Sequence, residues 1–321
     1  MVDGVDKFLR RYPDSPVVED VLGTLDVGEI RARVRELDPE SEEIFFFAAS
    51  VGALFGLRRR DGSRVAMKVH KLFTDETYFD EVHRVQSALA DAGFPAPRPL
   101  RRRGLVTWEE WRDVGAFRNA HEPDVRRAMA AALARFHELA TATGFRPRRR
   151  FLPLDDDGLW PVPHNALFDF EATKLGAEWI DEIARVAKNR SRETEIGVER
   201  VGHTDWSAKH FRFDERLEPT VLYDWDSVTT DREPNLVGTA AASFTYTEEL
   251  GEEIALWPSA DESIAFIADY EAARGAPFSG EERDAAQAAC VYLRAYAARC
   301  RHSYEGDARE TDLEGIAKAL L

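Results

Sequence analysis

The spacing of apolar and polar residues in the first part of the chain predicts a small antiparallel sheet. Two apolar runs flank Ser50-Val51-Gly52 within residues 43–56, and Asp61-Gly62 separates them from a third run, Arg64–His70. An Asp-Gly pair between apolar runs is a strong signal for a hairpin. A further strand is expected over Leu105–Trp111. We therefore predict that the first hundred residues are mostly strand, with one or two helices.

A helical spacing of apolar residues dominates the rest of the chain. Apolar positions that recur every three to four residues predict amphipathic helices. Three segments have this spacing: Tyr78–Ala92, Val125–Ala140 and Trp179–Arg192. Residues 146–164 are expected to be irregular, and a short hairpin is expected between Phe211 and Tyr223. After Val237 we expect only helices.

This order of elements predicts the fold class. A β-rich part followed by a helical part is typical of an α+β protein with two lobes. We place the N-terminal lobe at residues 1–110 and the C-terminal lobe at residues 111–321.

The charge of the chain is acidic and unevenly distributed. The 321 residues include 43 Lys and Arg and 59 Asp and Glu, which gives a net charge of −16. This balance argues against nucleic acid and against an anionic membrane as partners, since both attract basic proteins. Residues 224–284 contain 15 acidic and 3 basic residues and so contribute −12 of this charge. Either this segment favours a cationic ligand, or its acidic residues lie on solvated helix faces.

Two further features concern the cellular environment. No apolar targeting segment is visible at residues 1–13, and the longest uncharged apolar run, Ile44–Leu57, is shorter than the roughly 20 residues of a membrane-spanning helix. Cys290 and Cys300 are ten residues apart in one predicted helix, which separates them by about 15 Å, too far for a disulfide. We therefore expect free thiols and a cytoplasmic protein.

Four short motifs carry candidate chemistry. Ser50-Val51-Gly52 forms a turn of small residues, where backbone amides can approach an anion closely. Lys68 lies in a predicted strand, and Glu81 follows early in the next helix as a possible partner for its ammonium group. The other two motifs are His203-Thr204-Asp205 and Tyr223-Asp224-Trp225-Asp226, which flank the short hairpin. Each motif alone is weak, and their order along the chain is the informative feature.

In this order the motifs resemble those of the aminoglycoside-phosphotransferase-like small-molecule kinases, which share the protein-kinase fold. The catalytic segment of that family has His-x-Asp, then four residues and Asn, then a hairpin and a metal-binding Asp. His203, Asp205 and Asp224 match this pattern, and the resemblance covers residues 40–305. It implies a bilobal kinase-like fold and transfer of phosphate from ATP, or alternatively GTP, to a hydroxyl group of a small molecule.

The resemblance also implies roles for individual residues. Asp205 would orient the acceptor hydroxyl, and Asp224 would bind Mg²⁺, with Asp226 as a further ligand or as a contact to the substrate. The nucleotide would be held by the following residues: Ser50, Gly52, Lys68 steadied by Glu81, and Glu109 in the strand that leads to the hinge. The acceptor would be a polar, cationic or neutral metabolite or an aminoglycoside-like antibiotic, and the protein a monomer or homodimer.

One position departs from the family pattern. The second metal ligand of the family is Asn, and this chain has His210 in its place. Imidazole is a poor ligand for Mg²⁺ and a better one for softer ions. Three outcomes follow: a site with one well-held Mg²⁺, a site that uses Mn²⁺, or a degraded site. The last outcome would make the chain a nucleotide-binding pseudokinase with a regulatory role.

Several residues near these motifs have a simpler structural interpretation. His203 is expected to be a hydrogen-bonding residue rather than a proton carrier, and Trp206 and Trp225 are expected to pack in the core. The chain lacks Gly-x-Gly-x-x-Gly and has Asp224-Trp225-Asp226 where a protein kinase has Asp-Phe-Gly, which argues against a protein kinase.

Overall fold

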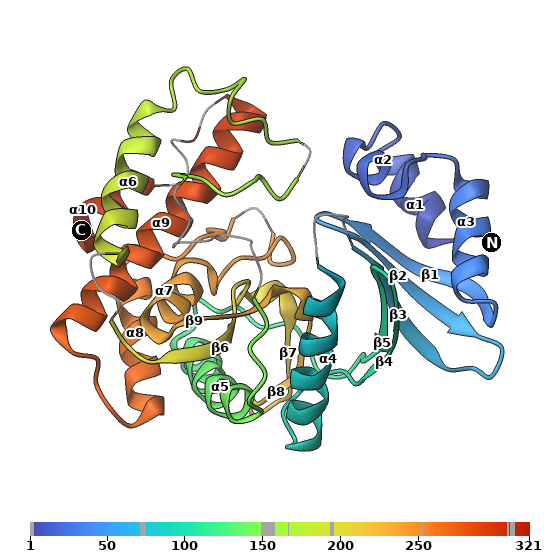
Figure 1. The fold of residues 1–321 in the computed structure, drawn as a ribbon, viewed down its shortest axis with the longest axis horizontal. Helices are drawn as coiled ribbons and strands as arrows, with labels where there is room; N and C mark the ends of the chain where they lie inside the picture. The colour runs from blue at the N-terminus through green and yellow to red at the C-terminus, as the bar shows by residue number, and fades with distance from the viewer. Residues whose placement is uncertain are drawn as a thin grey trace.

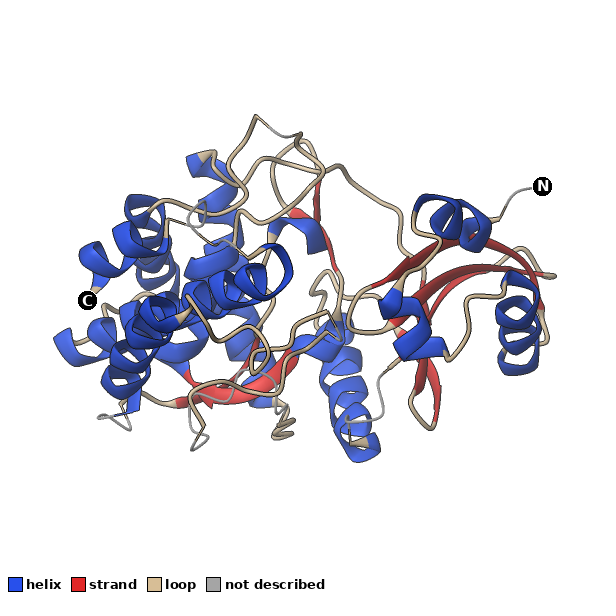
Figure 2. Ribbon diagram, turned by 90° about the horizontal axis from the view of Figure 1, so that it is seen from above, coloured by secondary structure: helices blue, strands red, loops and turns tan. Residues whose placement is uncertain are grey.

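The computed structural model describes residues 3–70, 75–148, 158–165, 167–192, 196–251, 253–306, 308 and 312–321. Within these residues the chain forms two lobes, a sheet lobe built from the N-terminal part and a larger helical lobe (Figures 1 and 2). Of residues 146–164, which we expected to be irregular, 149–157 lie outside the described residues, and the described remainder contains no helix or strand. None of the described helices is long and apolar enough to cross a bilayer.

The sheet lobe contains five antiparallel strands in the order β1-β2-β3-β5-β4. Their bounds are β1 Ser41–Ala49, β2 Ala53–Arg59, β3 Arg64–Val69, β4 Pro99–Arg103 and β5 Val106–Glu110. The central strand β3 pairs Lys68 with Leu54 of β2 and with Thr107 of β5. This register fixes the lysine in the middle of the sheet, where both neighbouring strands restrain it.

Three helices precede the sheet, which corrects the expectation of one or two helices in the first hundred residues. They are α1 Gly4–Arg11, α2 Pro16–Leu22 and α3 Val27–Leu37, and α4 Glu76–Asp91 brings the number in this part of the chain to four. The side chains of Asp3, Ser15 and Asp26 accept the backbone N–H three residues ahead and so cap the first three helices. Apolar residues of these helices share one core with the sheet, on the face that points away from the helical lobe in Figure 1.

Helix α4 lies between the sheet and the helical lobe (Figure 1). Its buried residues Phe79, Val82, Val85 and Leu89 belong to the core of the helical lobe. The sheet therefore rests on the second lobe partly through this helix, and the helix borders the space between the lobes.

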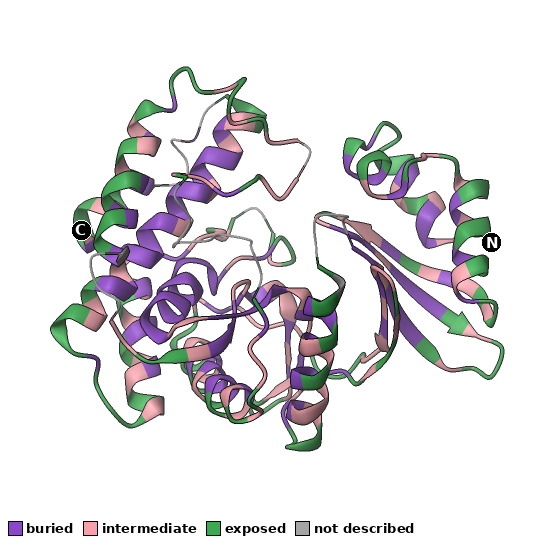
Figure 3. Cartoon of the chain, viewed as in Figure 1, coloured by how far each residue is buried: buried purple, intermediate pink, exposed green. Residues whose placement is uncertain are grey.

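The helical lobe is built on six helices within the described residues, of which α5 and α6 have bounds close to the predicted segments 125–140 and 179–192. They are α5 Pro123–Ala142, α6 Glu178–Arg192, α7 Glu233–Ser243, α8 Ala260–Arg274, α9 Gly280–Glu305 and α10 Leu313–Leu320. Every residue of α7 is buried, and much of α9 is buried too (Figure 3). Cys290 and Cys300, both on α9, are free and buried, as expected.

Two small sheets lie on the helical lobe next to the space between the lobes. The predicted hairpin is present as β7 Phe211–Phe213 and β8 Pro219–Leu222. The second sheet joins β6 Glu199–His203 to β9 Val228–Arg232, and we did not predict it. Together they position the segments 203–210 and 223–227, which contain two of the candidate motifs, on the side of the helical lobe that faces the sheet lobe.

Candidate active site

A cleft of about 420 Å³ lies between the two lobes and brings the predicted motifs together. This volume is in the range of small-molecule sites in proteins. Residues of both lobes line it: Ser50, Gly52, Lys68 and Glu109 from the sheet lobe, and Lys209, His210, Asp224 and Asp226 from the helical lobe. Of the predicted site residues, Asp205 lies at its edge, in contact with His210, and Glu81 is not among the lining residues.

Lys68 binds the two carboxylates of the Asp224-Trp225-Asp226 motif. Its Nζ lies 2.5 Å from Oδ1 of Asp224 and 2.9 Å from Oδ1 of Asp226. Burial lowers the pKa of Lys68, but the two carboxylates outweigh it and leave the pKa above its ordinary value. The lysine is therefore a fixed cation in the centre of the cleft.

The expected pairing of Lys68 with Glu81 is wrong. The face of α4 that lines the cleft presents Phe79, Val82 and His83, and helical spacing places Glu81 on a different face of α4 from these residues. The lysine finds its carboxylates on the facing lobe instead. It therefore links the two lobes directly rather than linking the sheet to α4.

We did not predict the residues that hold Asp226. Nδ1 of His70 lies 3.1 Å from Oδ2 of Asp226, and Nε2 of the same ring lies 2.9 Å from Oγ1 of Thr107. The hydroxyl of Tyr78 donates to the backbone carbonyl of Asp226 at 2.7 Å. His70 directly follows β3 and is two residues after Lys68, so the alternation of an extended chain places both side chains on the same face. That spacing was the signal available in the sequence.

The segment around Asp205 is held by backbone and side-chain hydrogen bonds. The backbone N–H of Asp205 donates to Nδ1 of His203, whose Nε2 lies 3.2 Å from the carbonyl oxygen of Tyr223. This arrangement requires the neutral tautomer with the proton on Nε2, and burial lowers the pKa of His203 to about 4. His203 is thus a structural residue, as predicted. Trp206 and Trp225 are also buried in the core, as expected.

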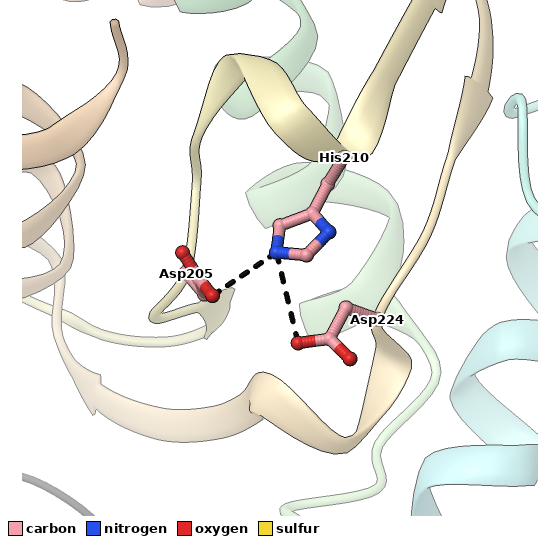
Figure 4. Close-up of side chains that lie close together, drawn as sticks. All are labelled: Asp205, His210 and Asp224. Carbon is pink, nitrogen blue, oxygen red and sulfur yellow. Dashed lines mark hydrogen bonds and ion pairs between the residues drawn. The ribbon is translucent and has the colours of Figure 1, made fainter. Parts of the chain in front are cut away.

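Asp205, His210 and Asp224 form the central cluster of the site (Figure 4). Nε2 of His210 lies 3.0 Å from Oδ2 of Asp205 and 3.7 Å from Oδ2 of Asp224. Burial raises the pKa of both carboxyl groups, but the surrounding cations outweigh it and hold both pKa values well below the usual range. Both carboxylates are therefore ionised at neutral pH.

The geometry of this cluster fits a divalent cation. The three residues can each offer one ligand atom, and these atoms all lie within 4.8 Å of one another. Asp224 has φ 66° and ψ 48°, a left-handed conformation that is uncommon for a residue other than Gly. Such backbone outliers cluster at functional sites. Two carboxylates and one imidazole make a donor set that suits Mn²⁺ better than Mg²⁺.

Lys209 is a further cleft residue that the sequence analysis missed. Its Nζ lies 2.9 Å from Oδ2 of Asp205, on the same oxygen that faces His210. The ring of Tyr246 lies on its other side, with the ammonium 5.1 Å from the ring centroid. The available signal was its position inside the segment between Asp205 and His210.

The turn between β1 and β2 closes the cleft from the sheet side. Gly52 packs so closely on β3 that a Cβ atom would lie 2.6 Å from the carbonyl oxygen of Val69. The backbone N–H of Ser50 donates to the carbonyl of Gly52 at 3.0 Å, which tightens the turn. Only Gly permits this close approach, and it keeps the turn over Lys68.

Glu109 lies on β5 with its side chain in the cleft. The side-chain amide of Gln86 donates to Oε2 of Glu109 at 2.7 Å and to the carbonyl of Pro97 at 2.8 Å. Burial raises the pKa of Glu109 to about 7, and the hydrogen bond from Gln86 opposes this only in part. The wall that the sheet lobe contributes to the cleft therefore carries a carboxyl group that titrates near neutrality.

Much of the acidic segment 224–284 has a structural role. Glu262 and Glu282 complete capping boxes at the starts of α8 and α9, and the buried Glu233 lies close to two arginines and accepts from Tyr270. Besides Asp224 and Asp226, the described acidic residue of this segment that lines the cleft is Glu249, which is paired with Arg212. The charge of the segment therefore carries no argument for a cationic ligand.

Comparison with known proteins identifies the fold. No family model and no curated protein matches the chain. Among solved structures, an amicoumacin kinase in complex with AMP-PNP, Ca²⁺ and Ami matches with a TM-score of 0.64 and 14% identity, over 92% of this chain and 96% of that chain.

Two further structures extend this similarity. An ethanolamine kinase of Plasmodium vivax matches with a TM-score of 0.53 and 10% identity, over 98% of this chain and 92% of that chain. A provisionally named aminoglycoside phosphotransferase of Ralstonia eutropha matches with a TM-score of 0.51 and 14% identity, over 92% and 96% of the two chains. These matches confirm the bilobal α+β, kinase-like fold and its resemblance to the small-molecule kinases.

Proposed function

We propose that this protein is a kinase that transfers the γ-phosphoryl group of ATP to a hydroxyl group of a small polar molecule. The observation that carries the proposal is the arrangement of Asp205, His210 and Asp224 opposite Lys68 in the interlobe cleft. Phosphoryl transfer requires mainly the positioning of two reactants and the neutralisation of charge, and these side chains supply both. We further propose the domain division at residues 110 and 111 and, from the two free thiols, a cytoplasmic location.

In this proposal Asp205 orients the acceptor. Its carboxylate is ionised and fixed by Ser207, whose hydroxyl donates to Oδ1 at 2.9 Å. A hydroxyl group that donates to this carboxylate is held with a lone pair directed at the γ-phosphorus. The pKa of Asp205 is low, so the proton transfers to it late, as the new oxygen–phosphorus bond forms.

The residues of the sheet lobe would hold the nucleotide. Lys68 provides a fixed positive charge for the phosphates, and the tight turn at Gly52 covers them. Asp224 and His210, with Asp205 or Asp226, would hold a divalent cation. When bound, such an ion neutralises charge on the phosphate oxygens.

His210 supports a second candidate, a pseudokinase that binds nucleotide without transferring phosphate. The imidazole contacts the carboxylates of both Asp205 and Asp224, so it occupies space between the residue that orients the acceptor and the metal-binding residue. Both candidate functions predict that the protein binds a nucleotide, but only the kinase predicts turnover of ATP. Turnover with Mn²⁺ or Mg²⁺ supports the kinase, whereas ADP binding without turnover under both ions supports the pseudokinase.

The experiment that tests the proposal is a mass-spectrometric screen for phosphorylated products. The purified protein is incubated with ATP or GTP, Mg²⁺ or Mn²⁺, and sets of amino alcohols, sugars and aminoglycoside antibiotics. Asp205→Asn should abolish product formation and leave the dissociation constant of ADP within about threefold. Glu138→Gln, on an exposed position of α5, is the matched control and should retain activity. Product formation by Asp205→Asn at the native rate would refute the role of Asp205.

A further inference from the structure

Lys209 and His210 are neighbours in the chain, yet both side chains reach the same carboxylate oxygen. Lys209 Nζ lies 2.9 Å and His210 Nε2 lies 3.0 Å from Oδ2 of Asp205. Both belong to a single 3₁₀ turn, η1 Ala208–His210.

The backbone of this turn is anchored to the segment that follows α7. The N–H of Ala208 donates to the carbonyl of Phe244 at 2.9 Å, and the N–H of Lys209 donates to the carbonyl of Tyr246 at 3.1 Å. The aromatic ring of Tyr246 then flanks the ammonium group. The position of Lys209 in the cleft is therefore built by the fold.

The ammonium group has hydrogen-bonding capacity left for a ligand. It carries three N–H donors, and within the described residues its one ion-pair partner is Asp205. The side chain is 36% exposed and lines the cleft. Lys68 lies against Asp224 on the nucleotide side, so the two ammonium groups lie at opposite ends of the row formed by Asp205, His210 and Asp224.

We propose that Lys209 is a catalytic residue that donates a hydrogen bond to an oxygen of the phosphoryl group during its transfer. The inference rests on the proposed function, which places the acceptor hydroxyl at Asp205. The transferred group passes between that hydroxyl and the nucleotide phosphates, and Lys209 is the cation beside the hydroxyl end of this path.

The reaction step is balanced without a further reactant. The acceptor oxygen forms a bond to the γ-phosphorus, the bond from this phosphorus to the bridging oxygen of ADP breaks, and ADP leaves with that electron pair. The hydroxyl proton passes to Asp205 and then to water. Lys209 is unchanged by the reaction. It stabilises negative charge on the non-bridging oxygens of the phosphoryl group, which lies between the acceptor and ADP in the transition state.

The competing explanation is that Lys209 acts only through Asp205, by holding its carboxylate in place. The two explanations differ in what happens to a bound mimic of the transferring group. A residue that contacts the phosphoryl group should strengthen the binding of ADP with aluminium fluoride, whereas one that only positions Asp205 should not.

The test compares Lys209→Met, Lys209→Arg and the native protein. Affinities for ADP alone and for ADP with aluminium fluoride are measured by calorimetry, and turnover is measured as ATP hydrolysis or as transfer to an acceptor from the screen. For Lys209→Met we expect the affinity for ADP alone to be unchanged. The ratio of the affinity for ADP with aluminium fluoride to that for ADP alone should fall at least tenfold, and kcat should fall about 100-fold. Lys209→Arg should recover part of both losses.

Lys318→Met is the matched control, since it removes the same charge from an exposed position of α10 and should behave as the native protein. Thermal unfolding and ADP binding show whether each variant is folded. The inference is overturned if Lys209→Met, folded and able to bind ADP, keeps its kcat or binds ADP with aluminium fluoride as tightly as the native protein does. A native protein that neither binds ADP nor turns over ATP would overturn the proposed function together with this inference.

Discussion

The buried carboxyl group of Glu109 makes a sharp prediction about how stability depends on pH. Glu109→Gln replaces the carboxyl group with a neutral amide of nearly the same shape. The carboxyl now accepts from Gln86 at 2.7 Å, and the carbonyl oxygen of glutamine can accept the same bond. The substitution therefore removes the titration and preserves the contact.

The sign and size of the effect follow from the pKa. Burial raises the pKa of Glu109 to about 7, from an ordinary value of 4.5. The native state thus holds the proton more tightly than the unfolded state. Its stabilising contribution is fully present below pH 4.5 and is lost as the pH rises through 7. At about 1.4 kcal/mol per pH unit, the difference amounts to about 3 kcal/mol as an upper bound.

The assay is urea unfolding of the native protein and of Glu109→Gln at several values between pH 5 and pH 8.5. We expect the variant to be about 1 kcal/mol more stable at pH 5 and up to about 3 kcal/mol more stable at pH 8.5. All other groups titrate in both proteins, so the difference between them isolates Glu109. The control Glu138→Gln, at an exposed position, should show no such trend. A difference that stays constant across this pH range would refute the assignment of a raised pKa to Glu109.

Two further predictions concern the metal and the turn over the phosphates. His210→Asn replaces the imidazole nitrogen by an amide oxygen and should move the preference for the divalent ion from Mn²⁺ toward Mg²⁺. The ratio of the initial rates with the two ions measures this preference. An unchanged ratio would show that His210 is no ligand. Gly52→Ala places a Cβ 2.6 Å from the carbonyl of Val69, so the turn must shift. We expect the KM for ATP to rise about tenfold while kcat changes little, and an unaltered KM would show that the turn does not cover the phosphates.

The sequence predicted the parts of the fold that depend on local patterns. Helices α4, α5 and α6 and the hairpin 211–223 were predicted close to their observed bounds because apolar periodicity and turn residues are local signals. The three N-terminal helices were missed although Asp3, Ser15 and Asp26 stand at their starts as capping residues. Their apolar stripes are short, and only contact with the sheet stabilises them.

Other elements could not be recognised from local patterns. The strand β4 contains three consecutive arginines, a run more typical of an exposed segment than of a strand. In the structure Arg101 stacks on Trp108 with its guanidinium 4.0 Å from the ring centroid, and Arg102 pairs with Asp80. The pairing of β6 with β9 joins Val201 to Thr230 across a long stretch of chain. Such pairings depend on tertiary structure, which spacing along the sequence does not reveal.

The sequence predicted several members of the candidate site but not their connections, and it missed Lys209 and His70. Lys68, Asp205, His210, Asp224 and Asp226 all lie in or beside one cleft, because the order of motifs along a kinase-like chain constrains where they fall. The partner of Lys68 depends on which face of α4 points inward, and a helix rotated by one residue changes that face by about 100°. The sequence could not determine that rotation, so the pairing with Glu81 was wrong.

The charges at the centre of the cleft bear on what His210 does. Three carboxylates, of Asp205, Asp224 and Asp226, face two ammonium groups, of Lys68 and Lys209. This arrangement leaves an excess of one negative charge, which attracts a cation. An imidazole that ligates a metal is uncharged, as an amide is. The presence of His210 where the family has Asn therefore leaves the attraction for a cation intact. It changes the donor atom from oxygen to nitrogen and thereby the ion that binds best. A changed metal preference is therefore a better-supported consequence of His210 than a loss of activity.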